Sequence, residues 1–327
     1  MKEEEIRPQK IFDEYLKLAT EDTQTYFGDV SLERGRCPAC GSEGHFEFEK
    51  SGFKYEECRE CHTLFVNPRP NPEAFDRYYT EAPSVEFWAT TFYRATEKGR
   101  REKLWKPKAK MIRDMLHSFS EQPDKTSVVD IGGGYGLFAE EYRTLTGQSP
   151  VVIEPGPSLA NACREKDLMV VEKFFEKVSR EELPRGPLLF TSFELFEHLF
   201  CPEEFLNQVY RAMQAGDLFI FTTLSGSGID IRGLWEDSKS VSPPHHLNFF
   251  NPKSVEHLLG KVGFNLLQVT TPGKLDIDIL ANNEDLIKDR FLKTFISQAS
   301  EEERNAFQDF VSSSGLSSHM MVVCRKE

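Results

Sequence analysis

The segment that most constrains this chain is a strand-like run that ends in closely spaced glycines. It reads Val128-Val-Asp-Ile-Gly-Gly-Gly-Tyr-Gly-Leu-Phe138. A β-branched strand that passes through a glycine turn into a helix lets the backbone approach a ligand closely, and Gly132, Gly134 and Gly136 permit that approach. Turns of this kind lie at the ligand-binding edge of parallel sheets, so the segment predicts both a fold and a binding site.

Apolar runs suited to buried strands alternate with helical stretches from residue 127 onward. This alternation predicts an α/β fold with a doubly wound parallel sheet. The strands that we can place cover residues 127–131, 150–153, 188–193, 218–223, 264–270 and 319–324. The intervening helices are expected at residues 137–144, 158–166, 202–215 and 252–262, with mostly helical structure over 284–310.

A cysteine cluster precedes this region. Cys37-Pro-Ala-Cys40 and Cys58-Arg-Glu-Cys61 form the pattern C-x2-C-x17-C-x2-C. Each pair places two thiolates on one tight turn, and two such turns supply the four tetrahedral sulfur ligands that suit Zn²⁺. A site with four protein ligands has no open position, so the predicted role of the zinc is structural. Four ordinary buried cysteines are the alternative.

These features divide the chain into four parts. We expect an N-terminal helix and loop over residues 1–33, a zinc ribbon over 34–70, connecting helices over 71–120 and the α/β domain over 121–327. Three prolines within residues 67–72 end the ribbon, because proline cannot continue a central strand. Pro107 is expected to begin a new helix, since proline is tolerated at the first helical position.

The overall charge restricts the partners that the chain is expected to have. It carries 40 Lys and Arg against 53 Asp and Glu, a net charge of −13 over 327 residues. An acidic chain is a poor candidate for binding nucleic acid, whose phosphates need cations. No apolar run is long enough to cross a membrane, and the first residues lack the apolar region of a secretion signal. We therefore expect a cytoplasmic protein without a membrane partner.

Two cofactor classes compete for the glycine turn. A dinucleotide pattern G-x-G-x-x-G that starts at Gly132 needs Gly or Ala at position 137, where this chain has Leu137. Glu154 follows the second strand, 22 residues after Gly132. An acidic side chain there accepts hydrogen bonds from ribose hydroxyls in both classes, so Glu154 indicates a nucleoside without deciding between them. A surface glutamate after a core strand is the alternative.

The pattern Asp-x-Gly-x-Gly-x-Gly, which begins at Asp130, resembles motif I of class I S-adenosylmethionine (SAM) methyltransferases. The resemblance implies that residues 121–327 form a SAM-dependent methyltransferase domain, with a Rossmann-like doubly wound sheet of seven strands and with SAM as its cofactor. Phe174 is an alternative to Phe175 beside the adenine. The residues that the resemblance assigns to SAM are Asp130, Gly132, Gly134, Gly136, Glu154, Phe175, Phe193 and Glu194.

The segment after the fourth strand carries Glu194, Glu197 and His198 in the spacing Glu-x-x-Glu-His. This spacing resembles that of ubiquinone-biosynthesis O-methyltransferases, in which the three residues can hold a divalent metal. Two carboxylates and an imidazole have the chemistry to do so. In other relatives the same residues only form hydrogen bonds to loops around the cofactor, and both readings stay open.

A further resemblance concerns the acceptor side. The ribbon, the run Phe65–Pro70 and the pair Tyr78-Tyr79 are together similar to sugar C-methyltransferases. The segment Ser242-Pro-Pro-His-His-Leu-Asn-Phe-Phe250 matches one that carries a catalytic histidine there, which implies His246 as the base and His245 as a hydrogen-bonding partner of the substrate. Histidine has a suitable pKa for such work. Capping of the helix at 252–262 is the alternative role.

The leading hypothesis is a SAM-dependent methyltransferase that acts on a small molecule, a sugar or nucleotide-linked sugar of a glycan or natural-product pathway. An RNA methyltransferase is a rival, because residues 94–113 hold nine Lys or Arg and two Glu, a local excess of +7. A solvated helical face is the simpler explanation of that stretch. A third hypothesis is a SAM-binding module without catalytic activity.

Overall fold

The structure, a computed structural model, describes residues 2–327 and contains a central sheet of seven strands in the order β12-β13-β10-β9-β6-β7-β8. Strands β6 to β10 pair in parallel, whereas β13 runs antiparallel to both of its neighbours. The sheet confirms the predicted α/β fold. Its strands are β6 (Ser127–Ile131), β7 (Val151–Ile153), β8 (Met169–Val171), β9 (Leu188–Phe193), β10 (Leu218–Leu224), β12 (Phe264–Thr270) and β13 (His319–Lys326).

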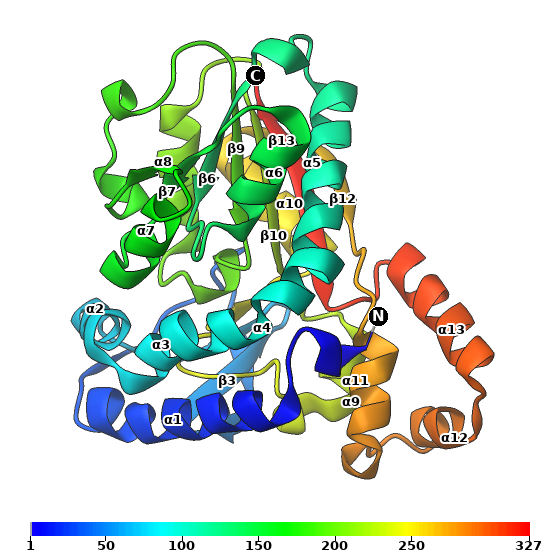
Figure 1. The fold of residues 1–327 in the computed structure, drawn as a ribbon. Coiled ribbons are helices and arrows are strands. Elements are labelled where there is room, and N and C mark those ends of the chain that lie inside the picture. Colours follow the sequence, from blue (N-terminus) through cyan, green and yellow to red (C-terminus); the bar gives the residue numbers. More distant parts are fainter. Residues whose placement is uncertain (1) are drawn as a thin grey trace.

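Helices cover both faces of this sheet (Figure 1). On one face, α5 (Lys106–Phe119) and α6 (Leu137–Thr146) pack on a cluster that contains Val128 of β6. On the other, α8 (Pro202–Ala212) and α10 (Pro252–Val262) pack on a cluster that contains Val129. Adjacent residues of a strand point to opposite faces, which is why two successive valines serve two cores. Further along, α7 (Pro157–Arg164) packs through Cys163 on Val152.

The cysteine-bearing region is a second, antiparallel sheet in the order β11-β4-β3-β2. Three strands come from the predicted ribbon, namely β2 (Gly44–Lys50), β3 (Phe53–Cys58) and β4 (Leu64–Val66). The fourth, β11 (Asn248–Phe249), lies after β10 and pairs with β4, so that Asn248 faces Phe65. The proline-rich end of the ribbon forms β5 (Arg69–Pro70), which pairs with β1 (Leu32–Glu33). The ribbon is thereby joined to the segment that carries His245 and His246.

Four helices form a cap across the end of the central sheet where β6, β9 and β10 finish (Figure 1). They are α1 (Gln9–Phe27), α2 (Pro72–Glu81), α3 (Pro83–Phe87) and α4 (Tyr93–Arg100). Two π-helical turns, Trp88–Phe92 and Arg101–Trp105, join α3, α4 and α5 into one helical run. Pro107 lies in the first turn of α5, as predicted, but this helix begins at Lys106 and continues directly from the π-helical turn before it.

The C-terminal helices lie beside the cap, at the same end of the sheet (Figure 1). They are α9 (Ile229–Leu234), α11 (Asp276–Asn282), α12 (Arg290–Gln298) and α13 (Glu301–Ser313), and they share a separate apolar cluster. No helix within residues 2–327 combines the length and the apolar character that crossing a membrane requires.

Some predicted boundaries need correction. The helix expected over 202–215 ends at Ala212, since Met213 is extended (ψ 152°) and Gly216 adopts a left-handed turn (φ 89°). The expected helix over 158–166 ends at Arg164, followed by a turn. Strand β8 is absent from the predicted set, because it has three residues and is only partly buried. A short edge strand leaves no continuous apolar run in the sequence.

Candidate functional site

A cavity of about 1420 Å³ lies where the carboxyl edge of the sheet meets the cap helices. The sequence-predicted site residues that line it are Gly132, Gly134, Glu154, Phe175, Phe193, Glu194, His245 and His246, together with Phe174, Glu197 and His198. Asp130 and Gly136 do not line it. One cavity thus contains most of the residues assigned to the cofactor and both histidines assigned to the acceptor.

The glycine turn follows β6 directly. Gly132 and Gly134 have positive φ values of 69° and 55°, which side chains rarely adopt, and a Cβ at Gly134 would lie 3.1 Å from the hydroxyl of Tyr93. Gly136 begins α6, and a Cβ there would lie 2.8 Å from Sγ of Cys163. Gly136 therefore allows close packing of α6 on its neighbour, whereas the first two glycines leave backbone exposed to the cavity.

Glu154 follows β7 and points back at the glycine turn. Its Oε2 accepts a hydrogen bond from the Gly134 N–H and its Oε1 accepts one from the Gly156 N–H, both at 2.9 Å. Burial raises the pKa of this carboxyl group, and the two backbone donors offset part of the effect. Each oxygen keeps a second lone pair, so the carboxylate can still accept hydroxyl hydrogens from a ligand.

Asp130 is a buried residue of β6 whose Oδ1 accepts a hydrogen bond from the Thr191 hydroxyl at 2.8 Å. Burial raises its pKa to about 7. It borders a small cavity of about 30 Å³ together with Gly133 and Phe193. Asp130 thus lines the small cavity but not the larger one, and Gly132 borders both.

Glu194 is the residue at which β9 turns away from the sheet. It has a positive φ of 53° without being glycine, a strained conformation of the kind that concentrates at functional sites. Its Oε1 accepts a hydrogen bond from the Thr222 hydroxyl at 2.6 Å and lies 3.2 Å from Nδ1 of His319 and 3.7 Å from Nζ of Lys108. Burial alone would raise its pKa, but these neighbours outweigh it and hold the pKa at about 2.

Glu197 is a second acidic residue of the site, and its side chain is buried. The Glu197 carboxyl accepts a hydrogen bond from the Thr223 hydroxyl at 3.0 Å, and burial, reinforced by Glu194, raises its pKa to about 8. Glu197, His198 and His246 each place one ligand atom within 4.8 Å of the others. The group that the structure brings together thus contains His246 where the sequence spacing suggested Glu194. Chemically, one carboxylate and two imidazoles can hold a transition-metal ion.

The two adjacent histidines have different partners. Nε2 of His245 lies 2.5 Å from the hydroxyl of Tyr78, which also contacts the Ser84 hydroxyl at 3.0 Å. Nδ1 of His246 donates a hydrogen bond to the Ser240 carbonyl at 2.6 Å, which leaves Nε2 with a free lone pair. Burial lowers the pKa of His245 to about 3 and that of His246 to about 4, so both are neutral near pH 7.

The four cysteines converge at the turns that precede β2 and follow β3. Sγ of Cys37 lies 3.5 Å from Sγ of Cys61, and Sγ of Cys40 lies 3.4 Å from Sγ of Cys58. All four sulfurs lie within 4.8 Å of one another. A tetrahedral ion with Zn–S bonds of about 2.3 Å needs sulfurs about 3.8 Å apart, so the donor set and its spacing fit zinc.

Some residues of the site were not found from the sequence. Lys108 reaches Glu194 from α5, and its ammonium also lies 4.6 Å from the ring centroid of Phe193. The only signal for Lys108 was its place in the basic stretch over 94–113. His319 reaches Glu194 from the start of β13, and Tyr93 lies above Gly134 from α4; neither belongs to a recognisable motif.

The basic stretch itself is largely neutralised by acidic neighbours. Within the described chain, six of its nine cations form ion pairs, namely Arg101, Lys103, Lys106, Lys108, Lys110 and Arg113. Arg94 and Lys98 are exposed, and Arg100 faces the cavity. This pairing favours the solvated-face explanation over a surface for RNA.

Comparisons with known proteins identify the domain around this cavity. A family model described as a methyltransferase domain matches residues 102–269, just over half of the 327 residues. No curated protein is significantly similar to the sequence.

Several solved structures are similar to this chain at low sequence identity. A SAM-dependent methyltransferase from Archaeoglobus fulgidus is 16% identical, with a TM-score of 0.46 over 72% of this chain and 100% of that one. A possible histamine N-methyltransferase from Thermotoga maritima is also 16% identical, with a TM-score of 0.45 over 72% and 98%. A geranyl diphosphate C-methyltransferase from Streptomyces coelicolor is 10% identical, with a TM-score of 0.46 over 71% and 84%. Because the family model matches more than half of its length, the chain belongs to the methyltransferase-domain family.

Proposed function

We propose that the protein transfers a methyl group from SAM to a small molecule, a sugar or nucleotide-linked sugar of a glycan or natural-product pathway. One observation carries the proposal: the glycine turn, Glu154 and the neutral imidazole of His246 line the same cavity. In-line methyl transfer to a bound acceptor needs cofactor-binding and proton-accepting groups in one cavity.

The cofactor would be held by groups at the carboxyl ends of β6, β7 and β9. Exposed backbone at Gly132 and Gly134 would take its amino-acid end, and the spare lone pairs of Glu154 would accept the ribose hydroxyls. Phe174 or Phe175 would flank the adenine, with Phe193 and Glu194 near the sulfur. When bound, SAM supplies an electrophilic methyl group. Asp130 and Gly136 would support the turn rather than touch the cofactor.

On the acceptor side, His246 is the candidate base. Its Nδ1–H is fixed by the Ser240 carbonyl, so the ring is oriented and Nε2 can take a proton from an acceptor hydroxyl or carbon acid. Nε2 of His245 is hydrogen-bonded to the hydroxyl of Tyr78, so only Nδ1 of its ring is free for a hydrogen bond to the substrate. The four cysteines would hold a structural zinc, because all four positions of a tetrahedral ion are filled by protein sulfur.

The proposed function is tested first by binding and then by turnover. Calorimetry should show heat with S-adenosylhomocysteine and none with NAD; the reverse result would overturn the cofactor. Incubation with isotopically labelled SAM and a metabolite extract should then give a labelled small molecule. No labelled product from any fraction, despite tight S-adenosylhomocysteine binding, would indicate a binding module instead.

Variants with the identified acceptor separate a base from a metal ligand. We expect His246→Gln to lower kcat about 100-fold or more, since general-base catalysis contributes on that order. His257→Gln is a matched control, because this histidine lies on the exposed side of α10. Activity that is unaffected by a chelator supports the base. Loss on chelation while the zinc content of the four cysteines is unchanged, with recovery on added Mn²⁺, would instead make His246 a metal ligand beside Glu197 and His198.

A further inference from the structure

Arg100, the last residue of α4, forms no ion pair with any residue that the structure describes. Its guanidinium lies over the rings of Phe92 and Tyr93, with Cζ 5.8 Å and 5.6 Å from their centroids. Its Nε is buried and has no hydrogen-bond partner, and no carboxylate within residues 2–327 forms an ion pair with it. The side chain lines the large cavity. Arg100 is therefore oriented toward a space that a ligand can occupy.

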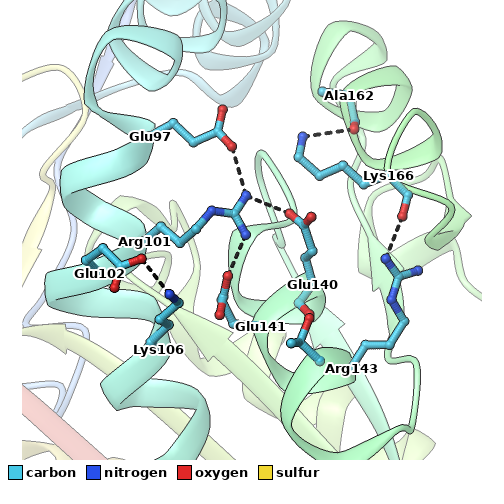
Figure 2. Close-up of polar contacts among 10 residues, drawn as sticks. Glu97, Arg101, Glu102, Lys106, Glu140, Glu141, Arg143, Ala162 and Lys166 are labelled. Atoms are coloured by element: carbon cyan, nitrogen blue, oxygen red, sulfur yellow. Dashed lines mark hydrogen bonds and ion pairs between the residues drawn. The ribbon is translucent and has the colours of Figure 1, made fainter.

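The next residue, Arg101, is an arginine whose guanidinium does have carboxylate partners. Figure 2 shows Arg101 surrounded by three carboxylates. Its Nη2 donates to Glu97 at 2.8 Å and to Glu140 at 2.7 Å, and its Nη1 donates to Glu141 at 2.5 Å. Two consecutive arginines of one helical run thus have opposite surroundings. Glu194 lies near enough to raise the pKa of Arg100, but no described carboxylate comes within ion-pair distance of it.

An unpaired buried guanidinium is costly, because it gives up water without gaining an acceptor. The aromatic rings beneath it offset only part of that cost. A cation–π contact also leaves the N–H donors at the edge of the guanidinium free. Those donors point to a missing anion, and the cavity is where an anion can enter.

We propose that Arg100 binds an acid group, a carboxylate or a phosphate, of a ligand held in the cavity. The planar fork of a guanidinium matches the oxygens of either group in a bidentate way. Arg7, whose side chain lines the same cavity, adds positive charge; its own partner is Glu3 at 3.1 Å. This inference rests on the proposed function, because it assigns a role within the same site.

The acid group has two sources. One is the α-carboxylate of the cofactor, because Tyr93, under the Arg100 guanidinium, places its hydroxyl against Gly134 of the glycine turn. The other is the acceptor, which would then be an acidic molecule such as a sugar phosphate or a nucleotide-linked sugar. The chemistry at Arg100 is the same in both cases, so the experiment has one arm for each source.

The test compares Arg100→Gln and Arg100→Lys with the exposed control Arg94→Gln. Calorimetry measures binding of S-adenosylhomocysteine and of 5′-methylthioadenosine, which lacks the amino-acid part. Pyrophosphate is titrated both into the free protein and into the protein saturated with S-adenosylhomocysteine. Thermal unfolding of each variant verifies folding. Because Arg100 has no protein partner, we expect both variants at this position to melt no lower than the parent protein.

If the cofactor supplies the acid group, Arg100→Gln weakens S-adenosylhomocysteine about 10- to 100-fold and leaves 5′-methylthioadenosine unchanged. If the acceptor supplies it, S-adenosylhomocysteine binds normally and pyrophosphate binding is lost. Arg100→Lys, which keeps the charge without the fork, falls between parent and Arg100→Gln. Parent-like binding of both ligands by Arg100→Gln overturns the proposal. Absence of S-adenosylhomocysteine binding in the parent protein would instead overturn the proposed function, and the pyrophosphate titration of the free protein would still report on Arg100.

Discussion

His246 is held in the protonation state that a base needs. Burial lowers its pKa to about 4, and the Ser240 carbonyl and Glu194 offset only part of that shift. His198 and His245 have lowered pKa values as well, so the imidazoles around His246 are neutral. Arg7 and Lys50 are the cations that lower its pKa further. A neutral ring offers its lone pair over the whole physiological range.

This state predicts the pH dependence of the reaction. With saturating acceptor, we expect no loss of kcat through His246 between pH 8 and about pH 5, and a tenfold fall per unit as the pH drops below about 4, where the ring takes up a proton. The acidic limb should be missing from the residual activity of His246→Gln. A limb centred near pH 6.5 in the parent protein would show an ordinary histidine and contradict the prediction.

The raised pKa of Asp130 predicts that the stability of the folded protein falls as the pH rises, whereas the activity that depends on His246 falls as the pH drops. The pKa of Asp130 is about 7 in the folded chain against 3.8 for an exposed carboxyl group, so the folded state keeps a proton that the unfolded state releases. Stability is therefore lost as the pH rises from about 4 to 7, by up to about 4 kcal/mol. Asp130→Asn keeps an acceptor for Thr191 and removes this loss.

We expect Asp130→Asn to be as stable as the parent protein near pH 4 and more stable at pH 8, as measured by urea unfolding across that range. The exposed Asp124→Asn is the control and should follow the parent curve. A variant that is destabilised equally at both pH values would mean that packing around Asp130, and not its proton, dominates.

At the scale of elements, the sequence predicts well those segments whose signal is local. Strand β9 has six buried residues in a row, and the residues of α10 start at proline and end before a glycine, so both were placed correctly. Strand β11 has two residues and exists only because β4 lies beside it. No local pattern can report such a partner, which lies in a distant part of the chain.

The site follows the same rule. Glu154 was predicted from its distance to the glycine turn and Glu194 from the resemblance of the Glu-x-x-Glu-His spacing; both side chains line the cavity. The contacts that determine the state of Glu194 come from Lys108 on α5 and His319 on β13. These contacts require the assembled sheet. The hydrogen bond between His245 and Tyr78 joins the β10–β11 segment to the cap. It also forms only in the assembled structure, so no local sequence pattern predicts it.

Loss of the ribbon should change the position of His246 in the cavity. The reason is that β4 of the ribbon pairs with β11, which follows His246 closely in the sequence. We expect the protein to contain one zinc per chain by plasma mass spectrometry, and Cys58→Ser to lose it. Structural zinc contributes folding free energy directly, so the variant should unfold several degrees lower. Cys201→Ser is the control, since Cys201 is exposed. Full zinc content in Cys58→Ser would contradict the site.

At the scale of the whole molecule, the cavity exists only while the cap stays on the sheet. Lys239 binds Asp13 of α1 at 2.7 Å on one side. On the other, Arg101 joins the helical run of the cap to α6, which begins at the glycine turn. Arg101 therefore links the cap to α6 through Glu140 and Glu141, while Glu97 binds it from within the same helical run (Figure 2).

Removing Arg101 should loosen that link. Arg101→Met leaves Glu97, Glu140 and Glu141 close together without a counter-charge, and the Arg101 side chain is only 20% exposed. Breaking such a pair in a largely buried setting costs about 2–3 kcal/mol, which urea unfolding would detect. Binding of S-adenosylhomocysteine should weaken as well, since the helix that begins at the glycine turn loses its anchor.

Lys106→Met is the matched control, because Lys106 pairs with Glu102 one turn apart at the surface (Figure 2). Exposed pairs of this type contribute about 0.5 kcal/mol or less. If both substitutions change stability equally, the three-carboxylate contact does not hold the cap. If Arg101→Met loses stability but binds S-adenosylhomocysteine like the parent protein, the cofactor side of the cavity forms without the cap, and only acceptor binding depends on it.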